Sequence, residues 1–232
     1  MRNSDRTKSK KHFTTPDLIV LMNELKAKEI IRLATLAPSG HNSQPWRFEV
    51  EEHVIRILPD LDRELVAVDP DHRELFFSLG CTAENIRIAA TRFCHDSTWR
   101  MVGPEGGVHH VEVALEPVNP DVLPDSLSLL LESRQSNRSV YLGARISDDI
   151  LDQVRAVPLE RGVTLRMHGF GSAGFEAIRS AVLSGNEIQM SDPAFREELL
   201  DWIRFNRRQA GESQDGLTNR VMGAPPAHTR KP

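Results

Sequence analysis

Apolar residues recur at helical spacing over two long stretches in the first half of the chain. Residues 15–37 begin with Thr15-Pro16, a pair that is typical of helix starts, and keep an apolar face as far as Pro38. Residues 72–93 have an almost continuous apolar face, which is typical of a helix packed deeply in a core. The pattern therefore predicts two long helices, the second of them buried.

Alternation of apolar and polar residues predicts strands around these helices. Residues 46–51 and 53–58 predict one β-hairpin, and residues 98–103 and 108–115 predict a second pair of strands. Residues 60–71, which are rich in aspartate and contain Pro70, are expected to form a loop. Helices and antiparallel strands in this order predict an α+β fold, with a mixed or antiparallel sheet flanked by helices.

A second series of elements is predicted beyond residues 119–125, which contain two prolines and give the best internal boundary. The series consists of a helix over 127–134, a helix over 150–157, a strand over 163–167 and helices over 173–187 and 194–208. We therefore expect a first half over 14–118 and a second half over 124–208. Residues 1–13, which are basic, and 209–232, which are polar, are expected to be disordered tails.

Composition narrows the class of protein. The 232 residues carry 29 basic and 33 acidic side chains and a formal net charge of −4, which argues against nucleic acid as the main partner. No apolar run approaches the ~20 residues of a membrane span, and no secretory signal is recognised. Two cysteines are too few for a disulfide framework, so the cytoplasm is the expected compartment.

The first segment that can carry chemistry is residues 37–48, which read Ala-Pro-Ser-Gly-His-Asn-Ser-Gln-Pro-Trp-Arg-Phe. Two prolines and a glycine predict a rigid loop between a helix and a strand. The uncharged donors and acceptors in it suit a flat heterocycle with ring nitrogens and carbonyl groups. An ordinary turn whose polar side chains satisfy the backbone is the alternative.

The second such segment is Arg134-Gln135-Ser136-Asn137-Arg138. Two arginines four residues apart, with a serine between them, can converge on one phosphate, because each guanidinium can donate two hydrogen bonds and the hydroxyl adds a third contact. The alternative is a charged helix end, at which arginine interacts with the helix dipole.

Taken together, the two segments resemble a known family. Pro-Ser-x-x-Asn-x-Gln-Pro-Trp resembles the flavin-binding loop of the nitroreductase superfamily, and Arg-x-Ser-x-Arg resembles its phosphate-binding segment. In most nitroreductases the arginine segment precedes the loop, whereas here it follows. That order, with residues 69–75 and 78–85, resembles the Acg-type branch, in which one chain contains two nitroreductase-like halves.

The resemblance implies a flavoprotein that binds FMN. Pro38, Ser39, Asn42 and Gln44 match positions that contact the isoalloxazine and ribityl side of FMN, and Arg134, Ser136 and Arg138 match positions that hold its phosphate. The implied activity is an FMN-dependent oxidoreductase that passes electrons from NAD(P)H to a nitroaromatic or quinone-type acceptor, with no catalytic side chain and no metal. The alternative is a chain that binds or sequesters FMN without turnover, or an inactive truncated paralogue.

The resemblance also sets an expectation about assembly. Acg-type chains usually continue well beyond the point where this sequence stops, so we expect the second half to be incomplete. The chain is then either a pseudo-dimeric monomer or a homodimer in which another chain fills the gap.

Overall fold

The computed structural model describes residues 15–105, 108–119, 121–136, 138, 141–219 and 221–222, with side chains from residue 25 onward. The tails predicted over 1–13 and beyond residue 222 lie outside the described residues. The chain divides into two units, one formed by residues up to 65 and 71–135 and the other by residues 66–70 and those from 136 onward.

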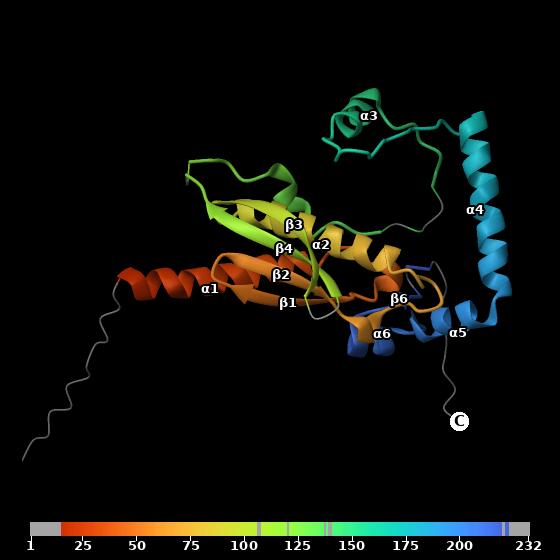
Figure 1. Ribbon diagram of the computed structural model, residues 1–232. Helices are drawn as coiled ribbons and strands as arrows, with labels where there is room; N and C mark the ends of the chain where they lie inside the picture. The colour runs from red at the N-terminus through yellow and green to blue at the C-terminus, as the bar shows by residue number, and fades with distance from the viewer. Residues whose placement is uncertain are drawn as a thin grey trace, which may run out of the picture. The chain divides into compact units, whose positions relative to one another are not determined.

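The first unit is built on a four-stranded antiparallel sheet with the strand order β1-β2-β4-β3 (Figure 1). The predicted hairpins are both present and are joined by a long helix, which packs against three of the strands and against the first helix. The bounds are α1 Thr15–Ala34, β1 Trp46–Glu51, β2 Val54–Pro59, α2 Arg73–Thr91, β3 His95–Glu105 and β4 Val108–Pro117. The α+β class predicted from the sequence is therefore confirmed.

One hydrophobic core lies between the helices and one face of this sheet. Its fully buried side chains come from α1, α2, β2 and β4, which explains why those segments have the strongest apolar periodicity. The largest of these side chains are Ile30, Leu33, Ile55, Ile57, Leu79, Ile86, Val111 and Val113. The core thereby fixes the position of every segment that leads into the loop at residues 37–45.

The opposite face of the sheet, here called the outer face, carries polar side chains that form a ladder of ion pairs across all four strands. Arg56 on β2 pairs with Glu51 on β1 at 2.7 Å and with Glu112 on β4 at 3.0 Å. Arg100 on β3 donates from Nε to Glu112 at 2.9 Å. Hydrogen bonds from Arg100 and Arg56 lower the pKa of Glu112 to about 2.

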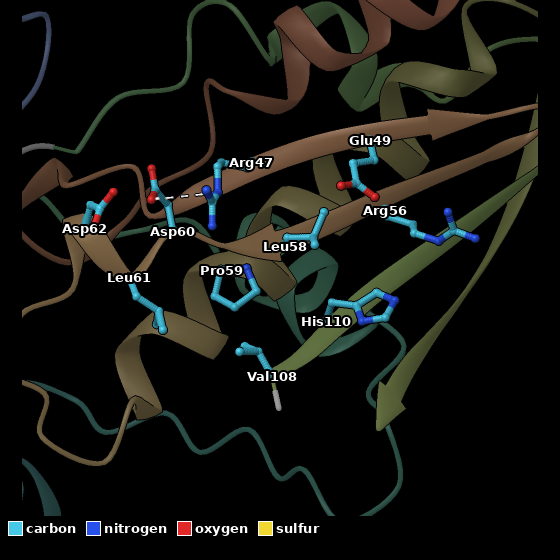
Figure 2. A pocket seen from close by; sticks show the side chains of 10 residues that line it. All are labelled: Arg47, Glu49, Arg56, Leu58, Pro59, Asp60, Leu61, Asp62, Val108 and His110. Atoms are coloured by element: carbon cyan, nitrogen blue, oxygen red, sulfur yellow. Dashed lines mark ion pairs between the residues drawn. The ribbon is translucent and has the colours of Figure 1, made fainter. Parts of the chain in front are cut away.

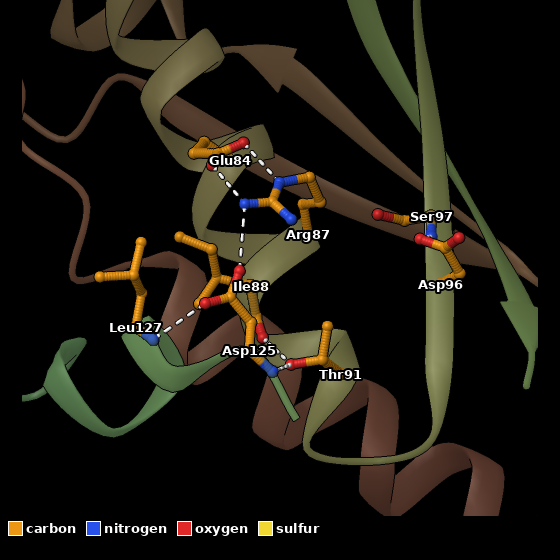
Figure 3. Close-up of polar contacts among 8 residues, drawn as sticks. All are labelled: Glu84, Arg87, Ile88, Thr91, Asp96, Ser97, Asp125 and Leu127. Atoms are coloured by element: carbon orange, nitrogen blue, oxygen red, sulfur yellow. Dashed lines mark hydrogen bonds and ion pairs between the residues drawn. The ribbon is translucent and has the colours of Figure 1, made fainter. Parts of the chain in front are cut away.

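Residues 124–135 belong to the first unit, because hydrogen bonds join them to α2. The backbone N–H of Asp125 donates to Thr91 Oγ1 at 3.0 Å, and the Asp125 carboxylate accepts from Arg87 at 3.4 Å and from the Leu127 backbone at 2.9 Å (Figure 3). Leu131 is buried in the core of the first unit. The expected helix over 127–134 is a short 3-10 helix, η3 Ser126–Leu130.

The second unit contains four helices and a two-stranded parallel sheet within its described residues. Its helices α3 to α6 contain no buried residue, whereas Leu217 is buried. Exposed apolar side chains are therefore abundant on α3 and α4. The bounds are α3 Asp148–Arg155, α4 Ala173–Ser191, α5 Pro193–Asp201, β5 Ile203–Arg204, α6 Arg207–Ser213 and β6 Leu217–Thr218.

Three sequence predictions in this unit are wrong. Residues 163–167 form no strand, because no described strand pairs with their backbone. The helix predicted over 194–208 ends at Asp201, after which β5 and α6 follow. Part of the tail expected from residue 209 is structured, because Asp215 forms an ion pair of 2.7 Å with Arg204 next to β6. No described helix has the length and apolar content needed to cross a membrane.

Candidate functional site

The loop between α1 and β1 has a backbone conformation that is costly for its residues. It contains the 3-10 turn η1 Gly40–Asn42, and His41, Asn42 and Gln44 have φ values of 48°, 55° and 54°. Non-glycine residues in this left-handed region are uncommon and cost of order 1 kcal/mol each. Such strain is concentrated at active sites and ligand clamps, so the loop is the first candidate for a functional site.

Hydrogen bonds within the loop hold this conformation. The Ser39 hydroxyl accepts from the backbone N–H of Gln44 at 2.9 Å, and the Ser39 carbonyl oxygen accepts from the backbone N–H of Asn42 at 3.0 Å. The backbone N–H of Ser43 donates to the carbonyl oxygen of Gly40 at 2.8 Å. Ser39 is therefore a residue that shapes the loop, and its own O–H remains a donor.

Packing against the segment before α2 fixes the loop from outside. A Cβ atom on Gly40 would lie 2.8 Å from Oε2 of Glu74 and 2.9 Å from Cδ1 of Leu65, so a larger residue here would require the ends of these two side chains to shift. Arg63 donates from Nε to the carbonyl oxygen of Ser43 at 2.6 Å. Trp46, at the start of β1, is buried and anchors the far end of the loop.

The structure brings one of the predicted arginines to this loop. Arg134 donates from Nη2 to the carbonyl oxygen of Leu36 at 3.0 Å, directly before the loop begins. Burial raises the pKa of the half-buried Cys81 thiol on α2, and the positive charge of Arg134 opposes this rise. Arg134 therefore lies beside the amide-rich loop, as Arg63 does, although Arg134 is far from the loop in the sequence.

The side chains around the loop offer a donor set that fits a flavin with a phosphate tail. Pro38 and Asn42 are exposed, and Ser39 and Gln44 are half-buried. Amide, hydroxyl and guanidinium groups are the donors that meet the carbonyl groups, ring nitrogens and phosphate of such a molecule. Ser136 and Arg138 belong to the second unit, so their part in phosphate binding stays a prediction.

Sequence reasoning missed three residues that position the loop, namely Gly40, Arg63 and Leu65. The sequence indicates Gly40 only as a residue of a turn. In the structure Gly40 also packs closely against Leu65 and Glu74, which lie 25 and 34 residues further along the chain. Arg63 acts on a backbone carbonyl, and no residue pattern marks such a contact. The density of charged residues over 60–71 was the only available signal.

No family model matches the chain. It is similar to a Mycobacterium tuberculosis protein named "Putative NAD(P)H nitroreductase Rv3131", with 25% identity over 176 residues, which cover 75% of this chain and 50% of that protein. It is also similar to "Putative NAD(P)H nitroreductase acg" of the same organism, with 32% identity over 105 residues, 45% of this chain and 31% of that protein.

A further relative is "Probable NAD(P)H nitroreductase PigM" of Serratia sp., with 23% identity over 82% of this chain and 54% of that protein. Among solved structures, a nitroreductase-like protein from Streptococcus mutans gives a TM-score of 0.35 at 18% identity, over 46% of this chain and 85% of that chain.

The chain thus spans about half the length of the relatives that it matches over most of its own length. The three relatives agree in name, since each is named an NAD(P)H nitroreductase. The comparisons therefore support the nitroreductase superfamily for this chain, with relatives of the Acg type.

Proposed function

We propose that the chain is an FMN-dependent oxidoreductase that passes electrons from NAD(P)H to a small-molecule acceptor, a nitroaromatic or a quinone. The observation that carries the proposal is the joining of the strained loop at residues 38–44 to Arg134 through the hydrogen bond to Leu36. Rigid amide groups and a cation in one place are the combination that binds the ring and the charged tail of a flavin.

Each residue of the site has a defined task in this proposal. Pro38 and Ser39 set the loop against the ring and the ribityl chain, and Asn42 and Gln44 donate and accept hydrogen bonds at the ring edge. Arg134, together with Ser136 and Arg138, holds the phosphate. FMN supplies the electron transfer itself when it is bound, so no nucleophile or general base is required of the protein.

Optical spectroscopy of the purified chain tests the proposal. The protein, as purified or after addition of FMN, should show the absorption bands of a bound flavin. Under anaerobic conditions NADH or NADPH should bleach these bands, and a nitroaromatic or a quinone should restore them. The same measurements on Arg134→Ala, with added FMN, should show weaker retention of the flavin after gel filtration.

The possible outcomes separate the proposal from its alternatives. A chain that retains FMN but is not reduced by either nicotinamide would be a flavin-binding protein without turnover. A chain that neither contains nor takes up FMN would contradict the proposal and leave a paralogue without the cofactor.

A further inference from the structure

We propose that a cavity on the outer face of the sheet binds a small organic cation with an apolar body. The cavity has a volume of about 480 Å³, which is within the range of small-molecule pockets. It lies within the first unit, over β1, β2, β4 and the 3-10 turn η2 Leu61–Arg63, and none of the predicted flavin-binding residues lines it. The proposal is therefore independent of the proposed function.

One part of the lining is apolar. Leu58, Pro59, Leu61 and Val108 surround the cavity from β2, η2 and β4 (Figure 2). Leu58 and Val108 are half-buried, and Leu61 is 41% exposed. These side chains provide a surface on which an aliphatic or aromatic body can be removed from water.

The charges around this surface leave an excess of carboxylates. Both arginines of the lining are already paired: Arg47 lies 3.8 Å from Asp60, and Arg56 contacts Glu51 and Glu112. Glu49 and Asp62 also line the cavity, and within the described part of the chain neither has an ion-pair partner. Electrostatic complementarity therefore favours a positively charged ligand over an anion.

A buried histidine supplies independent support for a ligand site. The side chain of His110 lines the cavity at the opposite end from Arg47 and Asp60 (Figure 2), and only 8% of it is exposed. Its Nε2 atom has no hydrogen-bond partner among the described residues, and the nearest carboxylate oxygen, on Glu112, is 3.6 Å away. A buried polar atom without a partner is costly, and a rotation of the His110 ring toward a bound polar group would remove this cost.

Ligand titrations followed by NMR test the proposal on the full chain. The probes are benzylamine, which is a cation at pH 7.5, benzoate as the matched anion and benzyl alcohol as the matched neutral molecule. Benzylamine should shift the ring signals of His110, which are assigned by their loss in His110→Gln. Benzoate and benzyl alcohol should shift them less, and added salt should weaken the binding of benzylamine.

Charge-neutralising variants identify the carboxylates. The double variant Glu49→Gln/Asp62→Asn should raise the Kd of benzylamine about threefold or more, as expected for partly exposed charges. The control Glu176→Gln/Asp152→Asn removes the same charge from exposed ion pairs of the second unit and should leave the Kd unchanged. Circular dichroism confirms that each variant is folded.

The proposal is overturned if benzylamine at millimolar concentration shifts no resonance of His110. It is also overturned if benzoate or benzyl alcohol binds as tightly as benzylamine, or if the Glu49/Asp62 double variant and its control have the same Kd. None of these readouts depends on flavin, so a failure here leaves the proposed oxidoreductase activity untouched.

Discussion

Arg134 donates a hydrogen bond from its guanidinium to the backbone carbonyl oxygen of Leu36 across 98 residues of sequence. The contact joins the end of the first unit to the residue that precedes the strained loop at 38–44. It also orients a positive charge beside the loop. Arg134, the first residue of the arginine segment, thereby lies beside the residue that precedes the loop segment.

Replacement of Arg134 by alanine should weaken FMN binding by on the order of 1.5–3 kcal/mol, the usual value of a hydrogen bond to a charged group. We expect the same range for Arg138→Ala, since both arginines are predicted to hold the phosphate. Fluorescence titration with FMN measures the effect. Arg145→Ala, which removes an exposed arginine paired with Asp148, is the control and should have no effect. Equal Kd values for all three variants would refute the phosphate assignment.

Two glycines of the first unit should respond to alanine with opposite signs. Gly40→Ala should lower the free energy of unfolding by about 1 kcal/mol, because the new methyl group would displace the ends of the Leu65 and Glu74 side chains. Gly80 lies on the exposed side of α2, and a Cβ atom at this position would meet no other atom within 4 Å. Gly80→Ala should therefore raise the free energy of unfolding by about 0.5–1 kcal/mol. Urea denaturation checks both values, and two shifts of the same sign would disprove the packing of the loop.

Acid should remove the stabilisation that Glu112 provides. Its pKa is about 2 in the folded protein, through hydrogen bonds from Arg100 and Arg56, against a usual value of 4.5. Between these values the unfolded chain binds more protons than the folded chain. The stabilisation is therefore complete above pH 4.5 and is lost as the pH falls toward 2.

Urea denaturation over this pH range tests the effect. Glu112→Gln should be less stable than the parent at pH 6, and its free energy of unfolding should fall less between pH 4.5 and 2.5. Glu116→Gln, at an exposed position of the same strand, serves as the control and should follow the parent. Parallel curves for the parent and Glu112→Gln would show that the ion-pair ladder contributes nothing.

The boundary of the first unit can be tested through two neighbouring leucines. Leu131 is 5% exposed and belongs to the core, so Leu131→Ala should cost about 2–5 kcal/mol of unfolding free energy. Leu129 is 77% exposed, and Leu129→Ala should cost less than about 0.5 kcal/mol. A thermal melt distinguishes these outcomes, and a harmless Leu131→Ala would place residues 124–135 outside the unit.

The sequence predicts the elements of the first unit well because the residues at the periodic apolar positions are the ones that the structure buries. Ile55 and Ile57 alternate with Val54 and Arg56, and the structure buries the first pair in the core. Residues 163–167 have the same alternation, but no described strand pairs with them. Alternation reports a tendency to form a strand, whereas a strand exists only when its backbone groups find partners.

The position of the candidate site along the chain could be predicted from the sequence, but the backbone conformation and the contacts of the loop could not. Pro38 and Pro45 predict a rigid loop, and its amide side chains indicate a polar ligand. The left-handed conformation of Gln44 could not be predicted, because glutamine does not favour it. The hydrogen bond from Arg134 to the Leu36 carbonyl oxygen could not be predicted either, because any exposed arginine near the core could have made that contact.

The arrangement of the sheet has a consequence for how the first unit folds. Each hairpin joins strands that are neighbours along the chain, whereas residues 54–57 of β2 pair with residues 111–114 of β4. Local pairings close small loops and form quickly, while a pairing between distant segments must first overcome a larger loss of chain entropy. The pairing of β2 with β4, together with the packing of α2 against both strands, is therefore the step that should limit the refolding rate.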